Sequence, residues 1–252
     1  MKKTLNLFSS AASYRRHYFD GSPVSFFFNT RLELVGKMLE GTNAKKMLDI
    51  GCGPGVAFSA IVPNGVHYFG ADSSKPMIEK CCELYHDNEF VHLALGQMEI
   101  LPFVKAAFDV VLCMGVLEYV ADKKSAISEV SRVVKPGGIV IISMLNKYSP
   151  YYLWEQHVLH NLQRVAGSIG IPVRRRVSHL DLIVESKLVK VIRQHKLDII
   201  DLTYFDFNIF IPPFDKTFPR RSIRVNKRLV CFQKTSLRKI GTAFLIKGQK
   251  YH

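Results

Sequence analysis

The sequence lacks any apolar run long enough to cross a lipid bilayer. No stretch reaches the roughly 18 apolar residues that a membrane helix needs, and the longest ones, such as Ile139 to Leu145, have the length of a buried strand. The first residues include two lysines, but Ser9, Ser10 and Arg15 interrupt the apolar core that a signal peptide requires. We therefore expect no membrane span and no secretion signal, and we predict that the chain stays in the cytoplasm.

Cysteines are few, and none has the spacing of a metal ligand. The chain contains five of them, which is an odd number: Cys52, Cys81, Cys82, Cys113 and Cys231. Small secreted proteins pair their cysteines in a framework of disulfides, whereas proteins of reducing compartments keep them as thiols. We expect reduced structural thiols here and no metal site.

Acidic residues are absent from the last part of the chain. Between Lys216 and His252 there are eleven Lys or Arg and no Asp or Glu, so the rest of the sequence holds the other 24 basic residues and all 21 acidic ones. A segment of this kind indicates an anionic partner, which can be a phosphate-bearing substrate, a nucleic acid or an anionic membrane surface. The alternative is a solvated surface with no partner.

Short apolar runs alternate with amphipathic segments through the middle of the chain. The expected strands are Lys46–Ile50, Val66–Ala71, Phe90–Ala94, Val110–Met114 and Ile139–Met144, and the clearest helices between them are Lys75–Tyr85 and Lys123–Val134. This alternation is typical of a parallel sheet that helices cover on both faces. The sequence therefore predicts an α/β fold.

The flanking segments complete one domain of 252 residues, without an internal repeat. We expect N-terminal helices or a lid over 1–45, with one helix over 30–40. The core is expected over 46–146, an insertion on the acceptor side over 147–180, and a helix with two strands over 181–252. Tyr14 and Tyr18 are candidates for the lid. An aromatic cluster of Tyr148, Tyr151, Tyr152 and Trp154 can line an apolar pocket or simply pack in the core.

The most specific motif is a glycine-rich turn between a strand and a helix. Asp49 and Ile50 lead into Gly51, Gly53 and Gly55, three glycines in five residues, and a helix is expected to begin near Phe58. Glycines at such a turn allow a tight bend and a close approach of a ligand to the backbone. The same kind of turn can hold the pyrophosphate of a dinucleotide, but that motif is spaced Gly-x-Gly-x-x-Gly.

Four further segments follow in order. The strand that ends at Asp72 places a carboxylate where it can accept hydrogen bonds from both hydroxyls of a ribose. Next come Gly96–Phe103, which reads GQMEILPF, and Phe108–Val120, which reads FDVVLCMGVLEYV. The segment Glu129–Gly138 then predicts a helix followed by a turn at Pro136-Gly137-Gly138.

Together these motifs resemble the class I S-adenosylmethionine-dependent methyltransferases, and within them the small-molecule group of the ubiquinone pathway (methyltransferase type 11). The resemblance covers about 100 residues, 47–146. It implies a Rossmann-like sheet of seven strands, mostly parallel with the last strand antiparallel, and S-adenosylmethionine as cofactor. The implied cofactor-binding residues are Arg31, Asp49, Gly51, Cys52, Gly53, Gly55, Asp72, Ser73, Met77, Gln97, Met98, Met114, Gly115 and Leu117. Gln97 departs from the family, which usually has an acid there, and Tyr119 stands where histidine is more usual.

The resemblance also suggests where catalysis occurs. A histidine is common just before the late helix in related small-molecule enzymes, so His179 is our first candidate for a general base, followed by Tyr119 and Glu118 at a strand exit. We expect a small or lipid-like acceptor that is methylated at oxygen and possesses an anionic group or lies at a membrane. The alternatives are an RNA methyltransferase that uses the basic C-terminal segment and a regulator that binds the cofactor without catalysis.

Overall fold

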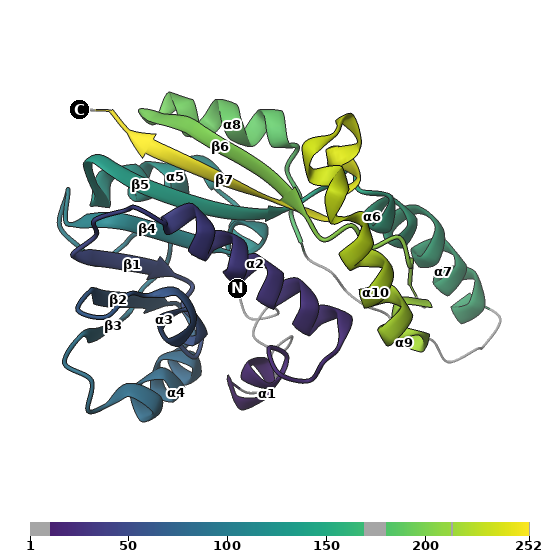
Figure 1. Ribbon diagram of the computed structural model, residues 1–252, viewed down its shortest axis with the longest axis horizontal. Coiled ribbons are helices and arrows are strands. Elements are labelled where there is room, and N and C mark those ends of the chain that lie inside the picture. The colour runs from purple at the N-terminus through teal and green to yellow at the C-terminus, as the bar shows by residue number, and fades with distance from the viewer. Residues whose placement is uncertain (1–10, 169–179, 213, 252) are drawn as a thin grey trace.

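The computed structural model describes residues 11–168, 180–212 and 214–251. Its centre is a seven-stranded sheet in the order β3-β2-β1-β4-β5-β7-β6 (Figure 1). The strands are β1 Lys46–Ile50, β2 His67–Asp72, β3 Val91–Leu95, β4 Phe108–Met114, β5 Val134–Leu145, β6 Leu197–Phe205 and β7 Ala243–Lys250. The first five strands are parallel, and β7 is antiparallel to both of its neighbours. The predicted fold class is confirmed.

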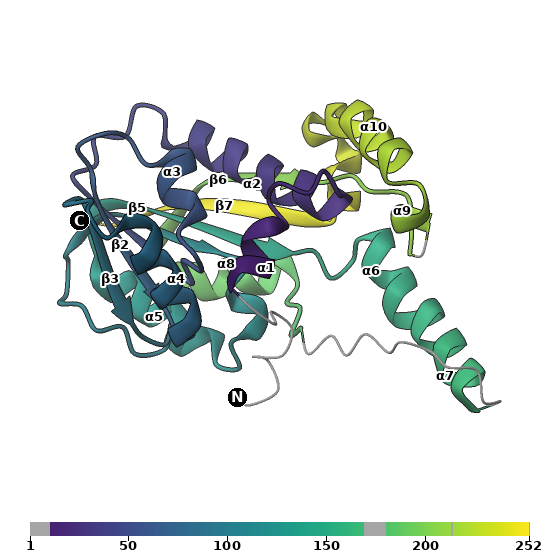
Figure 2. The same cartoon turned by 90° about the horizontal axis from the view of Figure 1, so that it is seen from below.

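Helices cover both faces of this sheet (Figure 2). They are α1 Ala11–Arg16, α2 Pro23–Leu39, α3 Val56–Ile61, α4 Lys75–Tyr85, α5 Lys123–Val133, α6 Pro150–Trp154, α7 His160–Ser168, α8 Glu185–Gln194, α9 Phe214–Thr217 and α10 Pro219–Leu229. A π-helical turn, Glu155–Leu159, joins α6 to α7. Short 3-10 turns occupy Leu117–Tyr119, Val230–Lys234 and Ser236–Ile240. Within the described ranges, no helix combines the length and hydropathy that crossing a membrane requires.

The central strand β4 shows how one apolar run supports two cores. Successive side chains of a strand point to opposite faces. Val110 and Leu112 pack in the core under α2 and α3, whereas Val111 and Cys113 pack in the core under α5 and α8. All four are fully buried. This double burial explains why β4 is continuously apolar from Val110 to Met114 and not alternating.

The sequence predicts a turn at Pro136-Gly137-Gly138, but the structure includes these residues in β5. Val134 already pairs with Phe108, and regular pairing resumes only where Ile139 meets Val110. The chain therefore turns within the strand, as an irregularity of the ladder that lets pairing continue on both sides.

Two helix starts also differ from those expected from the sequence. The helix after the glycine-rich turn begins at Val56, not near Phe58. Helix α2 begins at Pro23, before the expected residues 30–40. There Ser22 accepts a hydrogen bond from the backbone N–H of Ser25 and proline occupies the first helical position, which together form a strong helix start.

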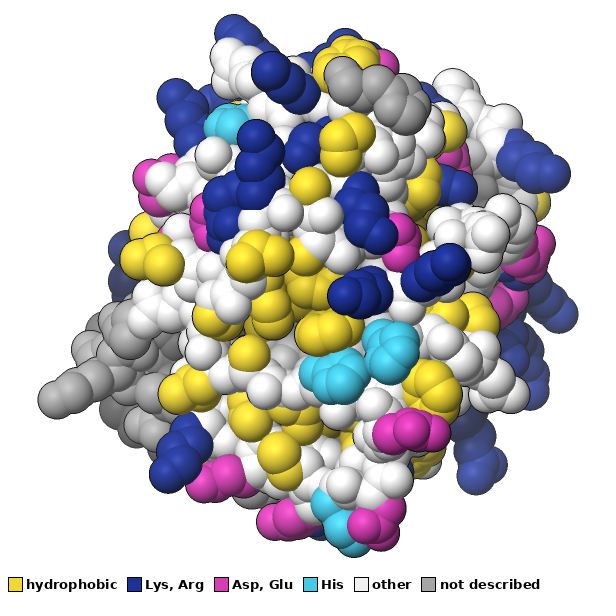
Figure 3. Space-filling model, turned by 90° about the vertical axis from the view of Figure 1, so that its left-hand side faces the viewer, with side chains coloured by type: hydrophobic (Ala, Val, Ile, Leu, Met, Phe, Trp, Pro, Cys, Tyr) yellow, Lys and Arg dark blue, Asp and Glu magenta, His cyan; other side chains and the backbone are white. Residues whose placement is uncertain are grey.

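Beyond one end of the sheet, α6, α7, α9 and α10 form a helical extension (Figure 1). Its two parts are joined by aromatic side chains from α6. The indole N–H of Trp154 donates to the carbonyl of Pro212 (2.9 Å), and the hydroxyl of Tyr151 donates to the buried Asp215 (2.7 Å). Two members of the predicted aromatic cluster therefore hold the extension together. The opposite end of the molecule presents Lys and Arg mixed with Asp, Glu and His (Figure 3).

A buried polar network attaches α10 to the sheet. Asp206 follows β6 in the left-handed region (φ 58°), where aspartate is better tolerated than most residues. Its carboxylate accepts hydrogen bonds from the Thr242 hydroxyl and from the Asn226 side-chain amide (2.5 Å). The Asn226 side-chain oxygen accepts from the backbone N–H of Phe207 (2.8 Å). Burial raises the pKa of Asp206 to about 6.

We predict that Asn226→Ala lowers the free energy of unfolding by about 2–4 kcal/mol, because it leaves the Asp206 carboxylate and the Phe207 N–H short of a partner in a buried site. Urea unfolding followed by circular dichroism measures the change. The control is Asn161→Ala, which removes a single hydrogen bond to the His157 carbonyl on an exposed helix and should change stability by less than about 0.5 kcal/mol. Equal effects of the two variants would contradict the proposed importance of the network.

Candidate functional site

The glycine-rich turn follows β1 at the carboxyl edge of the sheet, where open α/β sheets bind ligands. The backbone N–H groups of Gly51 and Cys52 both donate to the carbonyl of Ala71 at the end of β2 (2.7 and 3.1 Å). These bonds hold the turn against the neighbouring strand before helix α3 begins.

Two of the glycines are required by packing. Gly51 has a φ of 70°, and a Cβ there would lie 2.2 Å from a methyl group of Val116. Gly55 has a φ of 75°, and its Cβ would lie 2.5 Å from the sulfur of Cys81. A side chain at either position is excluded by backbone conformation and by a neighbour at once. The turn is thus held between the segment after β4 and helix α4.

Asp72 links the turn to the end of β2. One carboxylate oxygen accepts a hydrogen bond from the backbone N–H of Gly53 (2.9 Å), and the other accepts one from the N–H of Ser74 (2.8 Å). Burial raises the pKa of Asp72, and these backbone bonds oppose that change. A carboxylate oxygen has two lone pairs, so each can also accept a bond from a ligand hydroxyl. This geometry accords with the predicted role in ribose binding.

Arg31 brings a buried positive charge to the same edge. Its side chain comes from α2, is only 4% exposed and donates to the hydroxyl of Tyr18 (3.3 Å). The guanidinium lies 5.1 Å from the ring centre of Phe28 and 5.8 Å from that of Phe27. A Cβ on Gly115 would lie 2.8 Å from its Nη1 atom, so the strand exit after β4 passes directly beside it.

Two buried carboxylates interact electrostatically with this guanidinium. Asp49, on β1, accepts a hydrogen bond from the hydroxyl of Tyr68 (2.8 Å), and burial raises its pKa to about 7. Glu118 accepts one from the backbone N–H of Leu145 at the end of β5 (3.0 Å), and burial raises its pKa as well. Both side chains are at most 2% exposed.

Each of these three charged residues keeps one buried polar atom without a hydrogen-bond partner among the described residues. The atoms are Nε of Arg31, Oδ1 of Asp49 and Oε2 of Glu118. Buried polar atoms are nearly always paired, so an unpaired group in a native structure needs an explanation. The set contains one cationic donor and two carboxylate acceptors, which fits a ligand that has both a carboxylate and an ammonium group.

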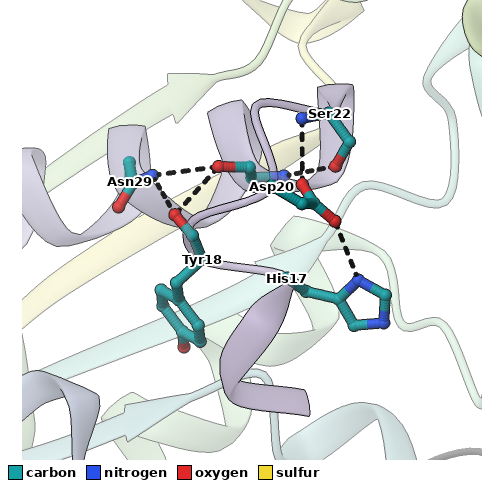
Figure 4. Close-up of polar contacts among 6 residues, drawn as sticks. His17, Tyr18, Asp20, Ser22 and Asn29 are labelled. Atoms are coloured by element: carbon teal, nitrogen blue, oxygen red, sulfur yellow. Dashed lines mark hydrogen bonds and ion pairs between the residues drawn. The ribbon is translucent and has the colours of Figure 1, made fainter. Parts of the chain in front are cut away.

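A helical hairpin of α1 and α2 closes over this edge, and polar contacts fix its shape (Figure 4). The carbonyl of Tyr18 accepts hydrogen bonds from the side chains of Ser25 (2.9 Å) and Asn29 (2.8 Å) on α2. Asp20 accepts from the N–H of Ser22 (2.9 Å) and contacts His17 (3.3 Å).

The hairpin places aromatic rings over the turn. The rings of Tyr14 and Tyr18 pack on Phe28, with centres 5.8 and 4.7 Å away. A Cβ on Gly53 would be 3.4 Å from the Tyr14 ring. Both tyrosines thus lie at the glycine-rich turn, and their role in a lid stays a prediction.

The other predicted cofactor residues differ in accessibility. Cys52, Met77, Met98, Met114 and Leu117 are all at most 8% exposed, whereas Ser73 and Gln97 are exposed. Leu117 and Met98 belong to the core under α5. The Cys113 thiol donates a hydrogen bond to the Met98 sulfur (3.7 Å). Their roles toward a cofactor stay predictions.

The predicted catalytic residues are only partly described. His179 lies outside the described residues. Tyr119 is 40% exposed, and the pKa of its hydroxyl is raised to about 12 by burial, so it keeps its proton at neutral pH. Glu118 is buried beside Arg31. The side-chain amide of Asn146, which follows β5, donates to the carbonyls of Lys239 and Gly241 (2.8 Å each). Both bonds stabilise the fold.

Sequence reasoning missed Tyr68, Tyr85 and Val116. Tyr68 orients Asp49, Val116 packs on Gly51, and the hydroxyl of Tyr85 donates to the carbonyl of Gly55 (3.1 Å). A tyrosine within a buried strand was the available signal for the first, because its hydroxyl needs a partner. The other two contacts join segments far apart in the sequence and left no local pattern.

Comparison with known proteins relates the chain to methyltransferases. A methyltransferase domain family matches residues 48–142. A protein named ubiquinone biosynthesis O-methyltransferase from Vibrio atlanticus is 31% identical over 181 residues, which are 71% of this chain and 73% of that protein. One of the same name from Alkalilimnicola ehrlichii is 33% identical over 126 residues, 49% of this chain and 51% of that protein. The chain thus spans about half the length of one relative and about three quarters of the other.

The fold has solved counterparts. The structure of a methyltransferase from Thermotoga maritima, described as S-adenosylmethionine-dependent, superposes with a TM-score of 0.60 at 18% identity, covering 99% of this chain and all of that one. At this identity the likeness concerns the fold alone. The segment matched to the family contains the glycine-rich turn, Asp49, Asp72 and Glu118, while Arg31 and the hairpin lie outside it.

We predict that Asp72→Ala weakens S-adenosylmethionine binding by about 100-fold or more, because it removes both the ribose acceptor and the hydrogen bond that positions Gly53. Titration calorimetry measures the affinity, and the thermal midpoint shows whether the variant is folded. Asp87→Ala, which removes an exposed carboxylate on the loop after α4, should leave the affinity unchanged. A folded Asp72→Ala protein with normal affinity would refute this assignment.

Proposed function

The chain belongs to the S-adenosylmethionine-dependent methyltransferases, and we propose that it transfers the cofactor's methyl group to an oxygen atom of a small, lipid-like metabolite. The relatives that share at least 30% identity over most of their length are named as O-methyltransferases of ubiquinone biosynthesis. That name supports oxygen as the acceptor atom and an acceptor with an apolar body.

The observation that carries the proposal is the set of unpaired atoms on Arg31, Asp49 and Glu118. The methionine part of the cofactor has one carboxylate and one ammonium group. The Arg31 guanidinium would hold the carboxylate, and the oxygens of Asp49 and Glu118 would accept from the ammonium. Asp72 would hold the ribose at the other side of the turn. The residues present therefore fit the group.

The cofactor supplies a methyl group that is already electrophilic, because it is bonded to a sulfonium. The task left to the chain is to orient the acceptor oxygen, to exclude water and to accept the proton of a hydroxyl acceptor. Tyr14, Tyr18 and Phe28 form an aromatic cover that keeps water from the carboxyl edge. We place the acceptor between this cover and the segment that begins with α6.

Glu118 is better suited to holding the cofactor than to accepting a proton, since it is buried beside Arg31 and bonded to the Leu145 N–H. Tyr119 retains its own proton at neutral pH. His179 is therefore the residue that we assign as general base, on the ground of its position in the sequence.

We predict that S-adenosylmethionine binds more tightly as the pH rises toward 7. The free Asp49 carboxyl has a pKa of about 7, and an ammonium group beside it favours the ionised form and lowers that pKa. Below pH 7 binding must expel a proton, so the dissociation constant should rise up to about tenfold for each pH unit of acidification. Above pH 7 this contribution levels off.

The pH dependence is measured by titration calorimetry between pH 5.5 and pH 7.5. Asp49→Asn should remove most of the slope, since it has no proton to lose. Asp122→Asn is the control: Asp122 is an exposed cap of α5, and asparagine caps equally well. An unchanged slope in Asp49→Asn would show that Asp49 does not face the ammonium.

Methyl transfer itself is tested with methyl-labelled cofactor and, separately, a lipid extract, a polar-metabolite extract and total RNA. Label in a lipid or small-molecule product, attached through oxygen, is the expected outcome. Label in RNA alone would overturn the proposed acceptor class. Binding of the cofactor without any transfer would favour a non-catalytic regulator.

Once a product is known, we predict that His179→Ala lowers kcat by about 100-fold or more while the affinity for the cofactor stays the same. The matched control is His160→Ala on α7, where the histidine is exposed; its rate should stay within about twofold of the unmodified protein. A normal rate of methyl transfer in His179→Ala would show that His179 is not the general base.

A further inference from the structure

Helix α10 presents a face made of basic side chains. Five of its eleven residues are exposed Lys or Arg: Arg220, Arg221, Arg224, Lys227 and Arg228. With 3.6 residues per turn they fall within an arc of about 120°, along a helix about 16 Å long. We call this surface the α10 basic face.

The opposite side of the helix fixes which way this face points. Ser222 and Asn226 are at most 3% exposed. The Ser222 hydroxyl donates to the side-chain oxygen of Asn208 (3.0 Å), and Asn226 bonds to Asp206 (2.5 Å). Hydrogen bonds to the segment that follows β6 therefore fix the rotation of the helix, and the basic face is held toward solvent.

Exposed aromatic side chains lie at the start of this helix. Phe218 is 43% exposed and Phe214, one turn earlier, is 51% exposed. The guanidinium of Arg221 lies 5.7 Å from the ring centre of Phe218. Asp215, the acidic residue of this segment, is buried and accepts a hydrogen bond from the hydroxyl of Tyr151. Its negative charge is therefore not part of the exposed surface.

The segment that contains this surface holds only one sign of charge. From Lys216 onward the chain has eleven basic residues and no acidic one. At the far end of the sheet, by contrast, basic side chains are mixed with acidic ones (Figure 3). A uniform positive field beside exposed aromatic rings favours an extended anionic partner over random solvation.

We propose that the α10 basic face docks onto the surface of an anionic phospholipid bilayer, with Phe214 and Phe218 entering the headgroup region. Phosphate groups spread over a plane match a convex stripe of Lys and Arg, and each charge near such a surface contributes about 1 kcal/mol. Amphipathic helices with basic and aromatic residues bind membranes in this way. Single-stranded RNA is usually bound in a positive groove, whereas this face is one side of a protruding helix.

The position of α10 relates membrane docking to the reaction, which here rests on the proposed function. The extension that contains α10 lies on the side toward which β5 leads, and α10 itself contacts α2 (Figure 1). A lipid-like acceptor leaving the bilayer would meet the enzyme at the end that holds the cofactor site.

Flotation with lipid vesicles tests the docking without any methyl transfer, so its failure and the failure of the proposed reaction are separate results. Vesicles of phosphatidylcholine and phosphatidylglycerol in equal parts should bind the full chain, and vesicles of phosphatidylcholine alone should not. Arg220→Gln with Arg224→Gln should weaken binding by about 20- to 40-fold. Phe218→Ser should also weaken it several-fold, and serine is a good cap for α10.

The matched control is Lys187→Gln with Lys190→Gln, which removes the same charge from exposed positions on α8 and should change vesicle binding by less than about twofold. Equal loss in both double variants would mean that net charge alone attracts the protein, and the proposal would fail. It would also fail if no vesicle bound the chain, if the chain floated only as a self-associated species, or if a single-stranded RNA oligonucleotide bound Arg220 and Arg224 more tightly than the vesicles at the same salt.

Discussion

A guanidinium withdrawn from water must be met by charge or by hydrogen-bond acceptors, and this requirement organises the carboxyl edge of the sheet. Arg31 is 4% exposed, and its partners come from different elements. Tyr18 reaches it from the hairpin, Asp49 from β1 and Glu118 from the segment after β4. None of these groups satisfies it completely, since Nε stays unpaired among the described residues. The fold therefore brings these polar groups together and leaves some of their hydrogen-bonding capacity unused among the described residues.

The central part of the structure could be predicted because its signals are local. Strand β4 is apolar from Val110 to Met114 since both of its faces are covered there. The glycine-rich turn is recognisable since only glycine fits at Gly51 and Gly55. Asp72 could be assigned from its position at a strand end. The same locality misled at Pro136-Gly137-Gly138, where a sequence typical of a turn lies inside β5, between Val134 and Ile139, which both pair with β4.

The remaining parts depend on contacts between distant segments. The buried side of α10 includes polar residues, so its apolar periodicity is weak, and its attachment depends on Asn226 meeting Asp206. Glu118 was expected to be catalytic from its place at a strand exit. Its burial beside Arg31, a residue 87 positions earlier in the sequence, is a property of the tertiary structure. No pattern in either segment indicates the other.

The hairpin of α1 and α2 gives this site a thermodynamic property. Tyr18 makes two kinds of hydrogen bond. Its carbonyl accepts from Ser25 and Asn29 and so holds the hairpin together, and its hydroxyl accepts from Arg31. A ligand that engages Arg31 therefore changes the stability of the closed hairpin, and by reciprocity the hairpin changes the affinity for that ligand. If the acceptor enters at this edge, as proposed above, the same reciprocity would couple its binding to that of the cofactor through the hairpin.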